Sequence, residues 1–276
     1  MKKSHLLFLA VSILGCVPKL KSTIITSLPP LSQSELIVAL EYEDSETVNG
    51  QLVGEVSTKD NGFSVDCGYN QSIKDLKELA RQNGANVVKI KQVRVPDAWT
   101  SCYRLMGKIY KVDNPKLYES KIEWSKDRKL TWADFKGKPQ TKEYPNTLAM
   151  TYSGFRLETN YKPFKESPIE VNNAFVTQQS WGLDAHRNEY VLQHEQLHFD
   201  ITEIFTRKLR KTLFDNNISS KHFDRAKEVF DAMFIEYKLF QDRYDNDTQK
   251  GEKKDTQEKW EAIVEIELAK YDAYKI

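Results

Sequence analysis

The sequence lacks an excess of charge of either sign. Its 276 residues carry 41 Lys and Arg against 40 Asp and Glu, which gives a formal net charge of +1 at pH 7. This balance provides neither the basic patch of a nucleic-acid-binding protein nor an acidic tail, so we expect no nucleic-acid partner. A hydrophobic content of 39% and an aromatic content of 11% suffice for one large or two modest domains.

Long apolar runs are also scarce. Residues 1–16 have a basic start and an apolar stretch too short to span a bilayer comfortably, and they end in Ile13-Leu14-Gly15-Cys16. This end resembles a bacterial lipobox, with Cys16 as the lipidated residue that anchors the chain to a membrane. Ordinary signal cleavage nearby and an uncleaved anchor are the alternatives. Each of these interpretations predicts a protein of the cell envelope, outside the cytoplasm.

Cysteine is rare, with three residues in the chain. If Cys16 belongs to the export signal, Cys67 and Cys102 remain, and no Cys-x-x-Cys spacing is present. In an oxidising compartment an isolated pair favours a disulfide over a metal site.

The N-terminal part predicts a tether followed by a small α+β domain. Residues 17–35 contain Pro18, Pro29, Pro30 and several Ser residues, a composition typical of an extended, flexible linker. Residues 36–112 hold strand-like runs at 36–42, 51–57, 85–95 and 101–112, and a helix predicted over 72–83 with Ser72 as its cap. This part resembles a small domain that recurs in bacterial surface lipoproteins, and no chemistry is attached to it.

A linker over 113–121 and a second domain over 122–276 follow. Strand patterns within 146–159 and 168–181 precede three helices, predicted at about 187–214, from 219 or 220 to 244, and 254–274. Strands followed by a run of helices predict an α+β architecture. The strand over 171–178 either lies at a sheet edge, where an extended peptide can add to it, or is internal.

Histidine is the third scarce residue, with five in the chain, and two of them fall in His194-Glu195-Gln196-Leu197-His198. Residues four apart share one face of a helix, so His194 and His198 can hold one Zn²⁺. Glu195 beside them can take a proton from a zinc-bound water. Apolar residues flank the motif at helical spacing, without Gly or Pro from Tyr190 to Phe214. The alternative is a surface helix with incidental His, or core His residues that pair with neighbours.

Four blocks of the second domain together resemble a known family. They are RKLTWADFKGKP at 128–139, SW at 180–181, LQHEQLHFDITEIFTRKLRKTL at 192–213 and YDNDTQKGEKKDTQEKW at 244–260. They resemble the predicted secreted zinc-dependent proteases of domain-of-unknown-function family 922. The resemblance covers about residues 122–276 and implies a zincin-like fold and peptidase chemistry on a peptide or protein substrate. Lys250 stands where the family usually has a His, and a protonated Lys cannot ligate zinc.

A catalytic zinc usually takes three protein ligands and keeps one open position. Asp245, inside the last family block, is the first candidate for the third ligand. Glu228 and Glu236 on the same predicted helix are alternatives, whereas His222 is expected at the surface. Tyr244 is predicted either to donate a hydrogen bond to the oxyanion of a reacting peptide or to pack in the core.

Four other residues are expected to support the site rather than to form it. Asp200 and Glu203 cannot share the histidine face of a regular helix, so we expect them to hold the ligands from outside or to pair with Arg207 or Arg210. The aromatic residues of the family blocks are expected in the core: Trp132, Phe135, Trp181 and Trp260.

The sequence therefore predicts a zinc-dependent peptidase of the bacterial envelope, with Glu195 as general base. One alternative is a pseudo-protease, weakened at Lys250, that acts as an envelope binding module. A second alternative is a structural surface lipoprotein whose helices only pack.

Overall fold

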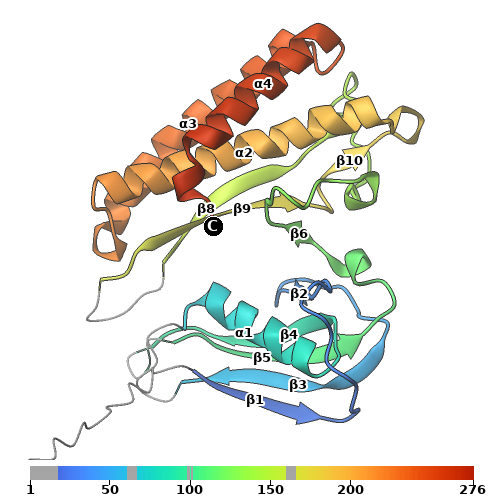
Figure 1. Ribbon diagram of the computed structural model, residues 1–276, viewed down its shortest axis with the longest axis vertical. Helices are drawn as coiled ribbons and strands as arrows, with labels where there is room; N and C mark the ends of the chain where they lie inside the picture. Colours follow the sequence, from blue (N-terminus) through green and yellow to red (C-terminus); the bar gives the residue numbers. More distant parts are fainter. Residues whose placement is uncertain (1–17, 61–66, 98–99, 101, 160–165) are drawn as a thin grey trace, which may run out of the picture. The chain divides into compact units, whose positions relative to one another are not determined.

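The computed structural model describes residues 18–60, 67–97, 100, 102–159 and 166–276. These residues fold into two compact units, one formed mainly by the chain up to Val112 and the other mainly by Asp113–Ile276 (Figure 1). Both units combine helices with strands, which confirms the α+β class. Within the described residues no helix is both long and apolar enough to span a membrane. The predicted signal peptide and Cys16 lie outside the described residues.

The first unit is built on four strands that pair antiparallel in the order β1-β3-β5-β4. They are β1 (Lys19–Ile24), β3 (Gln51–Lys59), β4 (Val87–Arg94) and β5 (Arg104–Lys111). Strand β2 (Val38–Leu40) is counted with the second unit. Helix α1 (Tyr69–Gln82) lies against β3, β4 and β5 and buries Leu76, Leu79 and Ala80. The helix begins three residues before the predicted start, so Ser72 is not its cap and is buried inside it.

The predicted tether over 17–35 is wrong, because part of it forms strand β1. Lys19 pairs with Lys59 and Ile24 with Gly54, although every side chain of β1 is exposed. Farther along, the Leu31 amide donates to the Arg81 carbonyl oxygen over 2.9 Å. Backbone hydrogen bonds rather than buried side chains hold this segment, so its sequence carries no apolar pattern that would reveal it.

The predicted Cys67–Cys102 disulfide is formed, and both cysteines are buried. Cys67 lies just before α1 and Cys102 just before β5, so the bond ties the start of the helix to the start of a strand. A cross-link across a separation of 35 residues stabilises this unit by restricting its unfolded chain.

The second unit begins inside the predicted linker over 113–121. The Asn114 side chain accepts a hydrogen bond from the Lys116 amide and starts a 3₁₀ turn, η1 (Pro115–Tyr118), followed by strand β6 (Lys121–Ile122). Tyr118 is buried. The linker prediction is therefore wrong, because Asn114-Pro115 marks a turn within a folded unit rather than a mobile connection.

Strand β9 (Ile169–Val176) lies between β6 and β8 (Ser153–Thr159) in an antiparallel sheet. Of the two alternatives for residues 171–178, the internal strand is therefore the one observed, and the sheet edge is excluded. Beyond β6, the side chain of Arg210 donates to the Val171 carbonyl oxygen over 2.9 Å and occupies that side of the strand. Alternate residues of β9 are buried, and the strand packs against the long helix that carries the His-Glu motif.

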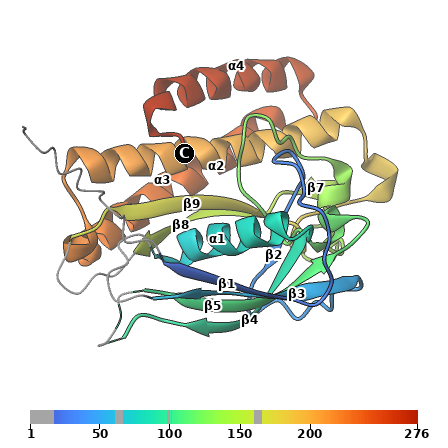
Figure 2. The same cartoon turned by 60° about the horizontal axis from the view of Figure 1, so that its bottom comes forward.

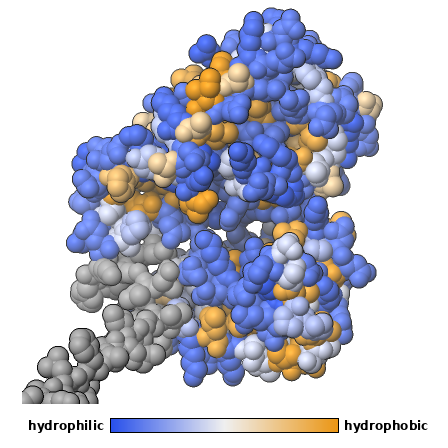
Figure 3. Space-filling view, viewed as in Figure 1, coloured by the Kyte–Doolittle hydropathy of each residue, from blue (hydrophilic) through white to orange (hydrophobic). Residues whose placement is uncertain are grey.

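That helix, α2 (Glu189–Asp215), contacts β8 and β9 of the sheet as well as α3 (Phe223–Thr248) and α4 (Lys254–Lys270). Figure 2 shows α2 between β9 and α4. Phe155 of β8, Ile201 and Leu209 of α2, Tyr237 of α3 and Trp260 of α4 share one apolar core. The shorter elements are strands β7 (Ala149–Met150) and β10 (Trp181–Gly182) and the 3₁₀ turns η2 (Trp132–Asp134), η3 (Asp184–His186), η4 (Ser220–His222) and η5 (Asp272–Tyr274). The face in Figure 3 is mostly hydrophilic, with apolar residues in small separate patches.

Candidate metal centre

Helix α2 starts from an N-cap, where the Asn188 side chain accepts a hydrogen bond from the Val191 amide over 3.0 Å. Glu189 lies in the first turn, where a negative charge favours the helix dipole. With no Gly or Pro inside it, α2 continues for 27 residues. His194 and His198 thus stand one turn apart on a regular helix and face α3.

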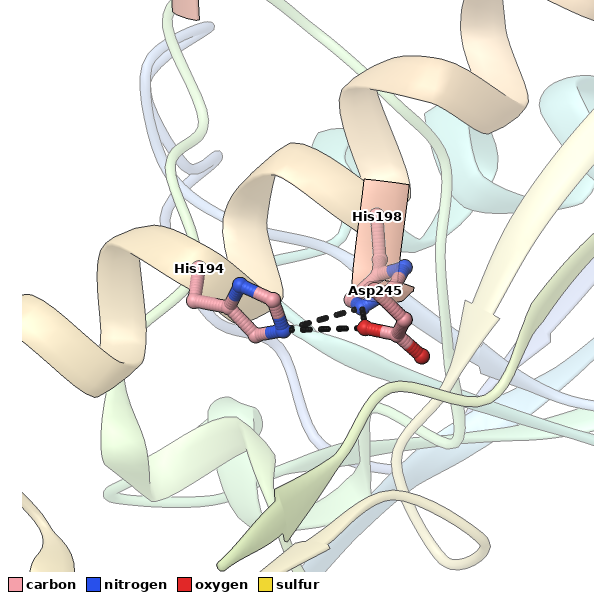
Figure 4. Close-up of side chains that lie close together, drawn as sticks. All are labelled: His194, His198 and Asp245. Atoms are coloured by element: carbon pink, nitrogen blue, oxygen red, sulfur yellow. Dashed lines mark hydrogen bonds and ion pairs between the residues drawn. The ribbon is translucent and has the colours of Figure 1, made fainter. Parts of the chain in front are cut away.

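The two imidazoles and the carboxylate of Asp245 converge on one point (Figure 4). Nε2 of His194 lies 3.2 Å from Nε2 of His198, and Oδ1 of Asp245 lies 3.2 Å and 3.1 Å from these two nitrogens. Ligands about 2.0–2.1 Å from a tetrahedral metal stand about 3.3–3.4 Å apart, close to the observed spacing. His194, His198 and Asp245 therefore form a group that can hold a metal ion.

Asp245 comes from α3, which continues to Thr248, four residues beyond the predicted end. The carboxylate is thus fixed on a helical turn rather than in a loop. The side chains of His194 and His198 are 6% and 15% exposed, whereas that of Asp245 is 36% exposed. The two histidines of the group are consequently shielded from solvent, and solvent reaches the group on the side of Asp245.

Two glutamines hold the imidazoles from outside. Nδ1 of His198 lies 2.6 Å from Oε1 of Gln241, and Nδ1 of His194 lies 3.2 Å from Oε1 of Gln257. An amide oxygen only accepts hydrogen bonds, so each Nδ1 carries the proton and each neutral ring presents the lone pair of Nε2 to the group. Sequence reasoning missed both residues, because glutamine is not a typical zinc ligand and neither belongs to the motif.

The charges of the group support one another. Burial opposes the ionisation of Asp245, but His194 and His198 hydrogen-bond to its carboxylate when their Nε2 atoms are protonated. These bonds outweigh the burial and hold the pKa of the carboxyl well below its ordinary value. Burial also opposes a charge on His198, yet the hydrogen bond and charge of Asp245, with a contribution from Glu195, raise its pKa to about 9. Without a metal, a proton therefore provides the positive charge that this site attracts.

Glu195 is 3% exposed, and its Oε2 is buried without a hydrogen-bond partner in the described part of the chain. Its backbone carbonyl accepts a hydrogen bond from Thr151 over 3.0 Å, which links α2 to the segment after β7. A buried acceptor left unpaired costs free energy, so such groups are uncommon unless they bind a water, a proton or a ligand. The unpaired carboxylate oxygen of Glu195 is therefore a candidate acceptor for a proton.

No protein-family model, curated protein or solved structure matches this chain. The resemblance to family 922 accordingly rests on the four sequence blocks alone. Any function proposed for the site must therefore be argued from its geometry.

Tyr244 does not take the position predicted for an oxyanion donor. It is fully buried, and its ring stacks on His194 with centroids 4.7 Å apart. Its hydroxyl donates to Oε1 of Gln257 over 2.6 Å, and burial raises the pKa of the phenol above its ordinary value. Since its hydroxyl is hydrogen-bonded to Gln257 on the inner side of His194, Tyr244 packs against His194 instead of facing a reacting group.

Lys250 lies outside the group. Helix α3 ends in a left-handed turn with φ of 51° at Gln249, 53° at Lys250 and 86° at Gly251. The Lys250 amide donates to the Asp245 carbonyl oxygen over 2.7 Å, while its side chain is exposed. A Cβ at position 251 would lie 3.1 Å from Cγ of His194, so glycine allows the turn to pack on this ring. The Lys250 side chain is therefore not part of the group.

The other predicted candidates stay apart from it. Glu228 and Glu236 of α3 and His222 of η4 are exposed, and Glu236 pairs with Lys208. Asp200 accepts hydrogen bonds from Trp124 over 2.6 Å and Gln196 over 2.8 Å.

The outer residues of α2 make the contacts that their helical positions predict. Glu203 pairs with Arg207 over 2.7 Å and with Arg210 over 3.6 Å, as expected. Phe135, Trp181 and Trp260 are buried as predicted, and Trp132 is partly buried.

A cavity of about 1140 Å³ lies in the second unit between α2, α4 and the segment around Trp124–Leu130. Apolar side chains such as Leu192 and Leu268 form part of its wall, and Glu261 of α4 also lines it. Glu261 accepts a hydrogen bond from Nε2 of Gln257 over 3.3 Å. The cavity wall is therefore connected to the residue that holds His194.

Proposed function

We propose that this protein is a zinc-dependent peptidase of the bacterial cell envelope. The observation that carries the proposal is the convergence of His194, His198 and Asp245 to within 3.2 Å, with the buried carboxylate of Glu195 on the same helix. Separate elements bring these residues together, with two donors from α2 and one from α3. An accidental His-x-x-x-His spacing would not by itself bring a third donor to that point.

The donor set favours zinc. Two imidazole nitrogens and one carboxylate oxygen, at spacings suited to a tetrahedral ion, are typical of zinc sites that keep a fourth position open. The partial exposure of Asp245 leaves a side from which a fourth ligand can enter. Lys250 does not weaken this set, since its side chain is exposed and its backbone supports Asp245.

A zinc ion bound here would polarise a peptide carbonyl and lower the pKa of a water molecule. Glu195 would act as the general base, because its unpaired Oε2 could accept a proton from the water and deliver it to the leaving amine. His194 and His198 would bind zinc as neutral rings, with their Nδ1 protons held by the two glutamines. With Tyr244 turned inward, no oxyanion donor is assigned to this chain.

The envelope location rests on the pattern of residues 1–16 and on the disulfide. A Cys67–Cys102 bond in the first unit is expected of a protein that folds outside the reducing cytoplasm. Lipidation at Cys16 would hold the protein on a membrane, where its substrates are peptides or proteins of the same compartment.

The test uses the full chain after export, assayed for zinc content and for cleavage of a quenched fluorescent peptide library. We expect one zinc per chain and cleavage that a chelator abolishes. Glu195→Gln should retain the zinc and lose about 10³-fold or more in cleavage rate, since the base is gone while the ligands remain.

Glu189→Gln is the matched control, because Glu189 is an exposed carboxylate in the first turn of the same helix. It should keep both zinc and activity. Stoichiometric zinc without cleavage of any library member would instead favour the binding-module alternative. Protein purified without chelator that takes up no zinc would overturn the metal centre itself.

A further inference from the structure

The two metal-facing histidines are held by glutamines, but the two amides are oriented by different partners. Gln241 donates its Nε2 to the backbone carbonyl oxygen of His198 over 2.9 Å. A backbone carbonyl can only accept, so the oxygen of Gln241 must face Nδ1 of the same histidine. The amide of Gln241, which holds His198, is thereby oriented by the main chain of α2.

The amide of Gln257, which holds His194, is not oriented by a hydrogen bond to the main chain in this way. Gln257 is 1% exposed, and its Oε1 faces both Nδ1 of His194, at 3.2 Å, and the hydroxyl of Tyr244, at 2.6 Å. Tyr244 does not settle which end of the amide faces inward. Its hydroxyl can accept from an amide nitrogen, and the His194 carbonyl oxygen, 3.3 Å away, offers its proton another acceptor.

The remaining contact of Gln257 decides the orientation. Its Nε2 donates to Oε1 of Glu261, one turn along α4, over 3.3 Å. A carboxylate accepts and does not donate, so it selects the nitrogen end of the amide and turns the oxygen toward His194. If the amide flipped, its nitrogen would face Nδ1, and His194 would have to carry its proton on Nε2, the atom that faces the metal.

We propose that Glu261 is a positioning residue that fixes the amide of Gln257 and so keeps Nε2 of His194 available to the metal. This inference rests on the metal-centre part of the proposed function. It assigns a role to a partly exposed glutamate that contacts neither the metal ligands nor Glu195. The chain of contacts runs from Glu261 through Gln257 to His194 and then to the metal.

The experiment measures two quantities in the full chain. The first is the tautomer of His194 in the metal-free protein, read from the ring ¹⁵N shifts at a pH where the ring is neutral. The second is the zinc dissociation constant, obtained by competition with a chelator. The first readout needs no metal, so it remains decisive even if the wild type fails to bind zinc and the proposed function falls.

Glu261→Gln keeps the size of the side chain but can donate as well as accept. We expect it to convert the single Nδ1–H tautomer of His194 into a mixture and to weaken zinc binding by about tenfold or more, the scale seen for partners of metal ligands. Glu265→Gln is the matched control: it removes the same charge one turn farther along α4, from an exposed residue that also lines the cavity. It should change neither readout.

The exchanged pair Q257E/E261Q supplies a rescue. A carboxylate at 257 can only accept from His194, and a glutamine at 261 can donate to it, so the Nδ1–H tautomer and most of the zinc affinity should return. A single tautomer and unchanged affinity in Glu261→Gln would overturn the proposal. So would an equal loss in Glu265→Gln, because the effect would then come from charge alone.

Discussion

The two halves of α2 are buried in different ways. From His194 to Glu203 the helix buries histidine, glutamate and aspartate side chains together with Leu197, Phe199 and Ile201. From Ile204 to Leu213 it buries mainly apolar side chains, and Arg207 is the one buried charged residue. Apolar burial stabilises a fold without further help, but buried polar groups do so only when partners satisfy them. One helix thus combines a mainly apolar half with a half whose buried polar groups depend on hydrogen bonds and ion pairs.

The largest difference between the two halves of α2 is expected when one of the proposed zinc ligands is removed. His198→Ala should lower the zinc affinity by far more than the roughly 10–100-fold expected for an outer partner, since one of three donors is lost. Chelator competition measures the effect. His222→Ala, which removes an exposed histidine of η4, is the control and should bind zinc as the wild type does. Equal affinity in the two variants would mean that the metal binds elsewhere.

The ion pair at the junction of the halves comes next. Arg207→Met leaves the buried Glu203 without its closest cationic partner, and burial already raises the pKa of this carboxyl above its ordinary value. We expect a loss of about 3–4 kcal/mol in unfolding free energy, measured by urea denaturation. Replacing both residues, as E203M/R207M, should recover much of that loss. A single variant as stable as the wild type would show that Arg210 and the Asn173 amide together satisfy Glu203.

In the apolar half, Leu209→Ala should lower the unfolding free energy by about 3 kcal/mol, because Leu209 is fully buried in the core shared with β8, α3 and α4. The zinc affinity of the folded protein should not change, and this separates the variant from His198→Ala. If Leu209→Ala lost zinc binding under conditions in which all of the protein is folded, packing in the apolar half would be coupled to metal binding in the other half.

The pH dependence of zinc binding is a smaller effect. The pKa of His198 is raised to about 9 from an ordinary value near 6.5. The bound proton therefore stabilises the metal-free fold fully below about pH 6.5, and this contribution disappears as the pH rises through 9. Zinc must displace the proton, so its affinity should rise by about tenfold per pH unit across this window and then level off. Competition titrations at several pH values test this, and a flat profile would contradict it.

The smallest effect is expected at the end of α2. Lys211 pairs with Asp215 on the solvent side, and surface pairs of this kind contribute little. Lys211→Ala should leave both the urea midpoint and the zinc affinity unchanged within error. A clear shift in either would mean that the solvent face of the helix matters more than its burial indicates.

The sequence identified the three residues of the candidate metal group through two regularities, the spacing of His194 and His198 on a helix and the position of Asp245 in a family block. It also placed Asp200 and Glu203 off the histidine face, because a 3.6-residue period fixes directions around the axis. It could not find Gln241 or Gln257, since their roles depend on how α3 and α4 pack on α2. For the same reason it could not decide between an oxyanion donor and a core residue for Tyr244, because the direction of a hydroxyl depends on its neighbours.

The strands were harder to predict than the helices. Strand β1 is held by backbone hydrogen bonds alone, and the central place of β9 depends on two paired residues of β6. Neither leaves a periodic pattern in the sequence.

The left-handed turn at Gln249–Gly251 has a consequence for how the end of α3 opens and closes. Asp245 stands in the last turn of that helix, and the amide of Lys250 is hydrogen-bonded to its backbone carbonyl. Terminal turns open more readily than helix interiors, so each opening here would also release one of the three donors. Metal bound to Asp245 would resist that opening, and hydrogen–deuterium exchange of the amides around Thr248 and Lys250 would slow as the site fills. The exchange rate of these amides would thus report how much of the site is occupied by metal, without the need for a substrate.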